Sequence, residues 1–115
     1  MRSLPRISIT AHGLIELVGG LLLLIAAFAL DLGGAGTMLT FAAGAMVAGV
    51  GLTASETLPI SAHQALDRAL AVGLAVAAVA CALSGGALAA VVLLSASATI
   101  LTLEATTHWS RAIRR

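Results

Sequence analysis

The chain contains four long apolar stretches that follow one another with only short breaks between them. We place them at residues 9–30, 36–55, 62–83 and 87–107. A helix needs about 20 apolar residues to cross the hydrocarbon core of a bilayer, and each stretch meets that length. Of the 115 residues, 60% are hydrophobic and 10% are charged, whereas a soluble domain carries about 25% charged residues. The sequence therefore predicts an all-α membrane protein with four transmembrane helices.

The breaks between the apolar stretches carry residues typical of turns. Gly33-Gly34 and Gly85-Gly86 predict tight turns inside two helical hairpins. Pro59 marks the central loop, because proline disfavours helix at the residue before it, and Ser61 is the expected N-cap of the third helix. The chain is therefore expected to form two hairpins joined by one central loop.

All basic charge lies on one side of the predicted bundle. The termini and the central region hold every basic residue of the chain, namely Arg2, Arg6, Arg68, Arg111, Arg114 and Arg115. The hairpin turns hold none, and Asp31 is the only charged residue near them. Because arginine-rich segments remain in the cytoplasm, we expect a multi-pass protein of the cell membrane with both termini cytoplasmic.

The two predicted hairpins are related in sequence. Residues 9–16 align with residues 60–67, and each copy continues through an apolar helix, a glycine pair and a second helix. The second helices end alike, with residues 52–57 matching residues 101–106. We therefore expect a single transmembrane domain, 1–115, built as a tandem duplicated helical hairpin. The repeats run over residues 7–57 and 58–109, a basic tail over 110–115, and the pseudo-two-fold axis along the membrane normal.

The layout is similar to that of bacterial SPW-repeat membrane proteins, which also pair two-helix repeats, but neither hairpin carries the Ser-Pro-Trp signature. Residues 14–19 resemble the neighbourhood of the functional glutamate of small multidrug exporters, yet the chain has no tyrosine and its only tryptophan lies near the C-terminus. We therefore assign no residue role from either family.

The expected partner is the lipid bilayer rather than a nucleic acid. The arginines flank helices and do not interleave with aromatic residues, which are limited to Phe28, Phe41 and Trp109. Trp109 is the expected interfacial anchor at the cytoplasmic boundary. Small residues such as Gly44 and Gly73 allow close helix packing, within the bundle or in a homo-oligomer or larger membrane complex.

Ionisable residues gather in the cytoplasmic half of the predicted bundle. The set comprises His12, Glu16, Glu56, His63, Asp67, Glu104 and His108. Residues four apart share a helix face, so each His-acid pair can point into the bundle together. Such groups are costly inside a membrane and normally face a protein interior, where they bind ions or relay protons. We expect an ion or proton site at Glu16, His12, His63 and Asp67, with Glu16 as its principal carboxylate.

Three functions remain open for this polar cluster. The first is binding of a divalent ion such as iron, manganese or zinc by the seven residues, or coupling of protons or ions to transport of a small solute. The second is a non-catalytic structural or accessory subunit, whose polar groups stabilise the bundle and a partner interface. The third is a haem held by His12 and His63, although both lie near a helix start among small residues. No catalytic residue is assigned, because the sequence carries no motif of a conventional hydrolase or nucleotide enzyme.

Overall fold

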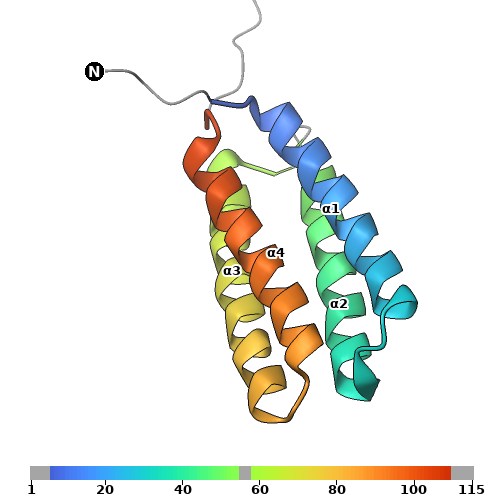
Figure 1. Ribbon diagram of the computed structural model, residues 1–115. Helices are drawn as coiled ribbons and strands as arrows, with labels where there is room; N and C mark the ends of the chain where they lie inside the picture. Colours follow the sequence, from blue (N-terminus) through green and yellow to red (C-terminus); the bar gives the residue numbers. More distant parts are fainter. Residues whose placement is uncertain (1–5, 55–57, 110–115) are drawn as a thin grey trace, which may run out of the picture.

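The computed structural model describes residues 6–54 and 58–109. It contains four helices: α1 (Ile9–Ala29), α2 (Gly33–Leu52), α3 (Ile60–Leu83) and α4 (Ala87–Thr106). They form two hairpins side by side, with both hairpin turns at one end and the α2–α3 connection at the other (Figure 1). The described residues form no β-strand, and an isolated bridge joins Ile7 to Thr107. The predicted all-α architecture with four helices is confirmed.

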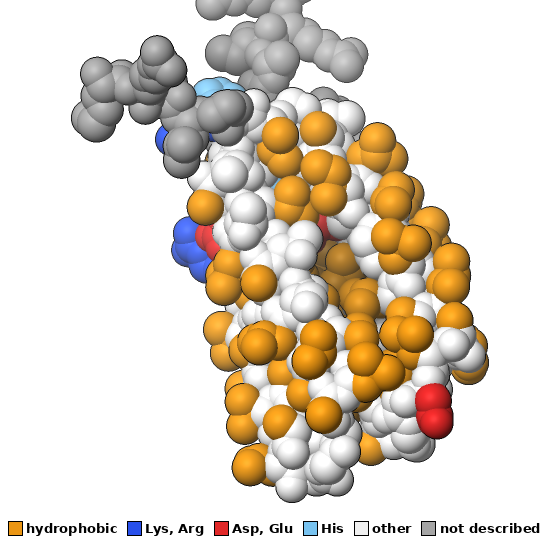
Figure 2. All heavy atoms as spheres, in the orientation of Figure 1, with side chains coloured by type: hydrophobic (Ala, Val, Ile, Leu, Met, Phe, Trp, Pro, Cys, Tyr) orange, Lys and Arg blue, Asp and Glu red, His pale blue; other side chains and the backbone are white. Residues whose placement is uncertain are grey.

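The helices suit a membrane in length and in surface. All four are long and apolar enough to cross a bilayer, with mean hydropathies between 1.6 and 2.0. Large apolar side chains point outward, including Phe28 and Met38, each 74% exposed, and Leu83, 85% exposed. Figure 2 shows hydrophobic side chains spread over one face of the bundle. Lipid is the solvent that covers such side chains without cost, so these features support a multi-pass membrane protein.

The first hairpin turn is shorter than predicted. Gly33 has a φ of +75°, a backbone conformation that glycine adopts without strain, and α2 begins at this residue. Gly34 therefore belongs to the helix, and the predicted start at residue 36 is three residues too late. The second turn follows the prediction, because Gly85 has a φ of +87° and Gly86 is the N-cap of α4.

The predicted start of the third helix is wrong by two residues. Pro59 is the N-cap of α3, and Ser61 lies inside the helix without a side-chain capping bond. The fixed φ of proline is compatible with a helix start, so no serine cap is required. Helix α2 ends at Leu52 rather than 55, and residue 55 lies outside the described part of the chain.

Small residues bring the helices of the first hairpin into backbone contact. Helix α1 packs mainly against α2, and α3 packs mainly against α4. A Cβ atom on Gly51 would lie 2.6 Å from the carbonyl oxygen of Gly13 and 3.0 Å from the Cβ of Glu16. Gly44 meets the backbone of α1 in the same way, whereas nothing lies within 4 Å of a Cβ on Gly49. Gly44 and Gly51 of α2 therefore hold α1 in place, and Gly49 does not contact it.

The hairpins meet through an apolar core, and a buried hydrogen bond holds α3 to α4 within the second hairpin. Leu93, fully buried, and Leu74, 5% exposed, belong to a cluster contributed by α2, α3 and α4. The Ser97 hydroxyl donates to the Ala71 carbonyl at 2.7 Å. Cys81 is a free cysteine buried in the same core, where it packs as a small apolar residue.

Candidate metal centre

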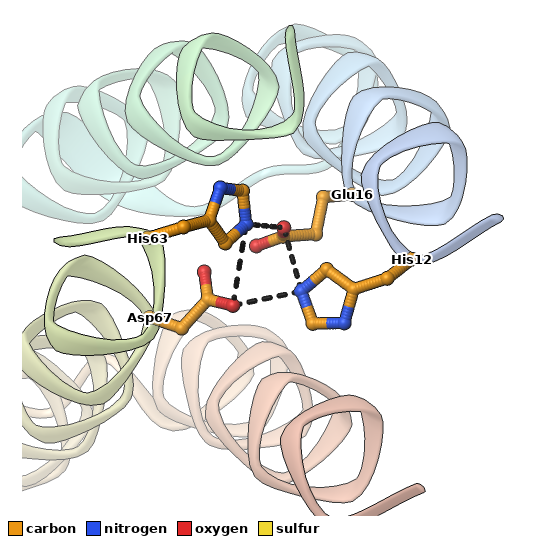
Figure 3. Close-up of side chains that lie close together, drawn as sticks. All are labelled: His12, Glu16, His63 and Asp67. Atoms are coloured by element: carbon orange, nitrogen blue, oxygen red, sulfur yellow. Dashed lines mark hydrogen bonds and ion pairs between the residues drawn. The ribbon is translucent and has the colours of Figure 1, made fainter. Parts of the chain in front are cut away.

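Four ionisable side chains converge inside the bundle near the end opposite the hairpin turns. His12 and Glu16 come from α1, and His63 and Asp67 come from α3 (Figure 3). The described backbones of α1 and α3 do not contact each other, so these side chains bridge the bundle interior. Each pair is separated by four residues, which places both members on one helix face.

The four groups form a closed ring in which nitrogen and oxygen alternate. His12 Nε2 lies 2.7 Å from Asp67 Oδ2 and 2.8 Å from Glu16 Oε1. His63 Nε2 lies 2.9 Å from Glu16 Oε1 and 3.5 Å from Asp67 Oδ2. All four ligand atoms lie within 4.8 Å of one another. Every histidine thus contacts the acid of its own helix and the acid of the other hairpin.

The group is sealed from solvent and contains two acids. Glu16 is 1% exposed, and the other three side chains are fully buried. With both histidines neutral, two ionised carboxylates give the group a formal charge of −2. Burial of an uncompensated carboxylate costs several kcal/mol of free energy, because the charged group loses its hydration. Positive charge in its centre or on its histidines, or protons on its carboxyl groups, would remove this cost.

The ring nitrogens that face away from the centre fix the tautomer of both histidines. Thr53 and Thr107 each donate the single hydroxyl proton to a carbonyl of the same hairpin. Each hydroxyl can then only accept at the imidazole, so Nδ1 of His63 donates to Thr53 at 3.0 Å and Nδ1 of His12 donates to Thr107 at 2.6 Å. In a neutral imidazole the other nitrogen then carries a lone pair. Both Nε2 lone pairs consequently point into the ring of carboxylate oxygens.

Two buried oxygens of the group have no hydrogen-bond partner. These atoms are Glu16 Oε2 and Asp67 Oδ1. Buried polar atoms are nearly always paired, because an unpaired one loses its water without replacement. The second oxygen of each carboxylate is therefore available to a ligand.

The local sequence explains how α1 reaches this position. Ser8 caps α1 by accepting a hydrogen bond from the Ala11 amide at 3.1 Å, which fixes the first turn before His12. Gly51 of α2 presents no side chain where Glu16 passes. Main-chain bonds from Ile7 to Thr106, 2.9 Å, and from His108 to Ile7, 2.8 Å, hold the segment before α1 against the end of α4.

Trp109 covers the histidines from the end of the bundle. Its indole nitrogen donates to the Glu104 carbonyl at 2.9 Å. The centroid of its ring system lies 4.9 Å from that of His12 and 5.9 Å from that of His63. The sequence predicted an interfacial anchor at this position, and the structure adds direct contact with both imidazoles.

The structure separates the seven predicted ligands into two groups. His12, Glu16, His63 and Asp67 lie together. Glu104 instead pairs with the partly exposed Arg68, and His108 is exposed on the segment after α4. Glu56 lies outside the described residues. The convergence of four residues therefore carries the site, and Glu104 and His108 are not part of it.

Sequence reasoning did not find Thr53 and Thr107, which orient the two histidines. Each is the C-cap of the second helix of its hairpin, and each contacts the histidine of the other hairpin. The aligned helix ends match Thr53 with Thr102, but Thr102 donates to the Ala98 carbonyl of its own helix. A threonine directly after the last apolar turn is the signal that would have suggested the correct pair.

No protein-family model, curated protein or solved structure matches the chain. The fold and the site therefore define its class by themselves. The protein is a four-helix membrane protein with a buried group of two histidines and two carboxylates that could hold a metal ion.

Proposed function

We propose that the protein binds one divalent transition-metal ion between His12, Glu16, His63 and Asp67. The observation that carries this proposal is the direction of the histidines: their Nδ1 atoms donate to threonines, and their Nε2 atoms face two carboxylates. In metal sites the outer nitrogen of a histidine is commonly held in this way, which leaves the inner nitrogen for the metal. Without a metal ion, neutral histidines would place their Nε2 lone pairs against carboxylate oxygens, and these atoms would repel each other.

The spacing of the ligand atoms supports a single four-coordinate ion. Metal–ligand bonds of about 2.1 Å place neighbouring ligand atoms about 3.0–3.4 Å apart. The four neighbouring distances in the ring run from 2.7 to 3.5 Å. One divalent ion also balances the formal charge of the group. Two imidazoles and two carboxylates suit zinc, iron(II) or manganese(II), and no thiolate is present to select a softer metal.

A haem between His12 and His63 receives no support from this geometry. A macrocycle would have to lie between the two imidazoles, and the ring centroids are 5.4 Å apart with an interplanar angle of 72°. Oxygens of Glu16 and Asp67 already lie within 2.9 Å of the histidine nitrogens. The space between the rings fits an ion and not a porphyrin.

The role we propose for the ion is to join the two hairpins. Lipid tails are as apolar as leucine, so helices in a bilayer have little hydrophobic drive to associate. An ion shared by α1 and α3 adds a bond across the bundle where their backbones do not touch.

We further propose that both termini and the centre face the cytoplasm. A reporter fused after Arg115 that is active outside the cell would contradict this orientation.

The chain offers a direct test through its only tryptophan. Trp109 contacts both imidazoles, and the chain has no tyrosine, so its fluorescence reports on the centre. Titration with Co²⁺ should quench this emission with a stoichiometry of one ion per chain, and elemental analysis should find a divalent metal in protein purified without chelator. His12→Ala should abolish both results, whereas His108→Ala, which removes an exposed histidine beside Trp109, should abolish neither.

Two other outcomes point to the remaining functions. Protein without metal whose quenching by Co²⁺ does not saturate would overturn the proposal and leave protonated histidines as the charge balance. Proton-coupled uptake of a solute into vesicles that is lost in Glu16→Gln would then support transport. A protein that co-purifies in constant ratio would favour an accessory subunit.

A further inference from the structure

A cleft opens between α1 and α4 on the lipid-facing side of the bundle. Its volume is about 440 Å³, and α1 and α4 form its walls, with Val47 of α2 at its base. Figure 2 shows the hollow on the face where α1 and α4 are drawn, with hydrophobic side chains inside it and an acidic side chain within. The rim is apolar and open, because Leu22 and Val91 are 60% and 61% exposed. A molecule dissolved in the bilayer can therefore enter sideways.

One ionisable residue lines this cleft, and it belongs to the candidate metal centre. Glu16 is part of the lining, and its Oε2 atom is buried without a hydrogen-bond partner. The other polar lining residues are Ser95 and Thr99, and the Thr99 hydroxyl already donates to the Ser95 carbonyl at 2.8 Å. The Ser95 side chain is exposed, so Glu16 Oε2 is the buried acceptor without a partner among the residues that line the cleft.

The groove on the opposite side of the bundle differs in this respect. It lies between α2 and α3, has a volume of about 290 Å³ and is lined by apolar and glycine residues such as Met46 and Gly73. No ionisable residue is among those that line it. A lipid tail can fill either recess, but a polar head finds a buried acceptor in the α1–α4 cleft.

We propose that the α1–α4 cleft binds a lipid-soluble amphiphile, with its hydrocarbon body along the apolar walls and a hydroxyl head that donates to Glu16 Oε2. The volume is within the range of small-molecule sites, about 300–1,000 Å³. The apolar walls exclude sugars, nucleotides and other polar ligands, which would lose their water without new hydrogen bonds. A hydroxyl head replaces its hydrogen bond to water with one to Glu16, whereas an alkane has no hydrogen bond to replace. This inference goes beyond the proposed metal site, because it requires Glu16 and the cleft but no ion.

The test uses full-length protein in lipid nanodiscs and a long-chain alcohol that carries a photoactivatable group in its chain. Labelling should saturate, should map to peptides of α1 and α4, and should be competed by hexadecanol about tenfold more effectively than by hexadecane. Equal competition by the alcohol and the alkane, or labelling that rises linearly without saturation, would overturn the proposal and indicate ordinary lipid contact.

Two glycines provide matched variants. Gly19 lines the α1–α4 cleft and Gly73 lines the opposite groove, and a Cβ at either position meets open space within 4 Å. Gly19→Phe should reduce saturable labelling about tenfold by filling the cleft, and Gly73→Phe should leave it unchanged. Equal reduction by both variants would contradict a specific site.

The competition experiment needs no variant, so a misfolded Gly19→Phe would not decide the result. Metal content is measured on the same preparations. Failure of the metal proposal would appear as empty protein, and failure of the cleft proposal would appear as unselective labelling.

Discussion

The packing of α1 against α2 and the junction of α1 with the second hairpin follow opposite principles. Helices α1 and α2 touch through glycine and alanine, so that Gly51 lies against the carbonyl of Gly13. Helix α1 meets the second hairpin instead through the long polar side chains of His12 and Glu16, which reach the α3 pair. Along its middle, α1 is separated from α4 by the cleft. The hairpin is closed by van der Waals contact, and α1 is joined to the second hairpin by polar chemistry.

This difference follows from the solvent. A three-residue turn keeps α1 and α2 adjacent. In a bilayer, close packing of small residues then stabilises their contact. Helices α1 and α3 are distant in sequence and do not contact each other through the backbone. A polar group shared across the interior is an effective way to join them, because no water competes for its hydrogen bonds.

The strongest test of this comparison removes one member of the polar junction. His63→Ala leaves the Glu16 and Asp67 carboxylates buried with His12 as the one remaining histidine of the ring, and breaking a buried charge pair costs about 3–5 kcal/mol. We expect a drop of this size in the free energy of unfolding, measured by reversible denaturation in mixed micelles. The exposed His108→Ala should stay within about 0.5 kcal/mol of the wild type, and an equal loss there would contradict the assignment.

A smaller effect is expected from the close contact inside the first hairpin. A methyl group added by Gly51→Ala would lie 2.6 Å from the Gly13 carbonyl oxygen, so α1 and α2 would have to separate. We expect a loss of about 1–3 kcal/mol, as is usual for overpacked interfaces. Gly49→Ala provides the control because its Cβ meets open space. The comparison of helix packing fails if the two alanine variants melt at the same temperature.

The threonines that hold the histidines should affect binding more than folding. Thr53→Val keeps the shape of the side chain but removes the acceptor for His63 Nδ1. We expect Co²⁺ affinity to fall about tenfold, the lower range for loss of an outer hydrogen bond to a metal ligand. Thr102→Val, which removes a hydroxyl bonded within its own helix, should leave the affinity unchanged. A fall of equal size in both variants would contradict the orienting role of Thr53.

The smallest effect is expected at the ion pair on the surface of the second hairpin. Arg68 is bonded to Glu104, but the arginine side chain is 66% exposed. Exposed pairs contribute about 0.2–1 kcal/mol. Arg68→Gln should therefore lower the free energy of unfolding by less than 1 kcal/mol, with Co²⁺ affinity unchanged. A large loss of metal affinity would show that Glu104 acts on the centre, against the separation described above.

The sequence by itself determined the number, length and type of the helices. Hydropathy and the 3.6-residue period are local properties, so four apolar stretches and two His-acid pairs of spacing four could be identified without tertiary contacts. The helix starts after two of the breaks were misjudged: α2 begins at Gly33, three residues earlier than expected, and α3 begins at Ile60, two residues earlier.

The tertiary structure alone decided how the helices face one another. The rotation of each helix selects His12, Glu16, His63 and Asp67 and turns Glu104 toward Arg68. It also supplies Thr53 and Thr107 from the opposite hairpins and leaves α1 apart from α4 at the cleft. A sequence pattern states which face of a helix is polar. Which other polar face it meets depends on packing between segments distant in the chain.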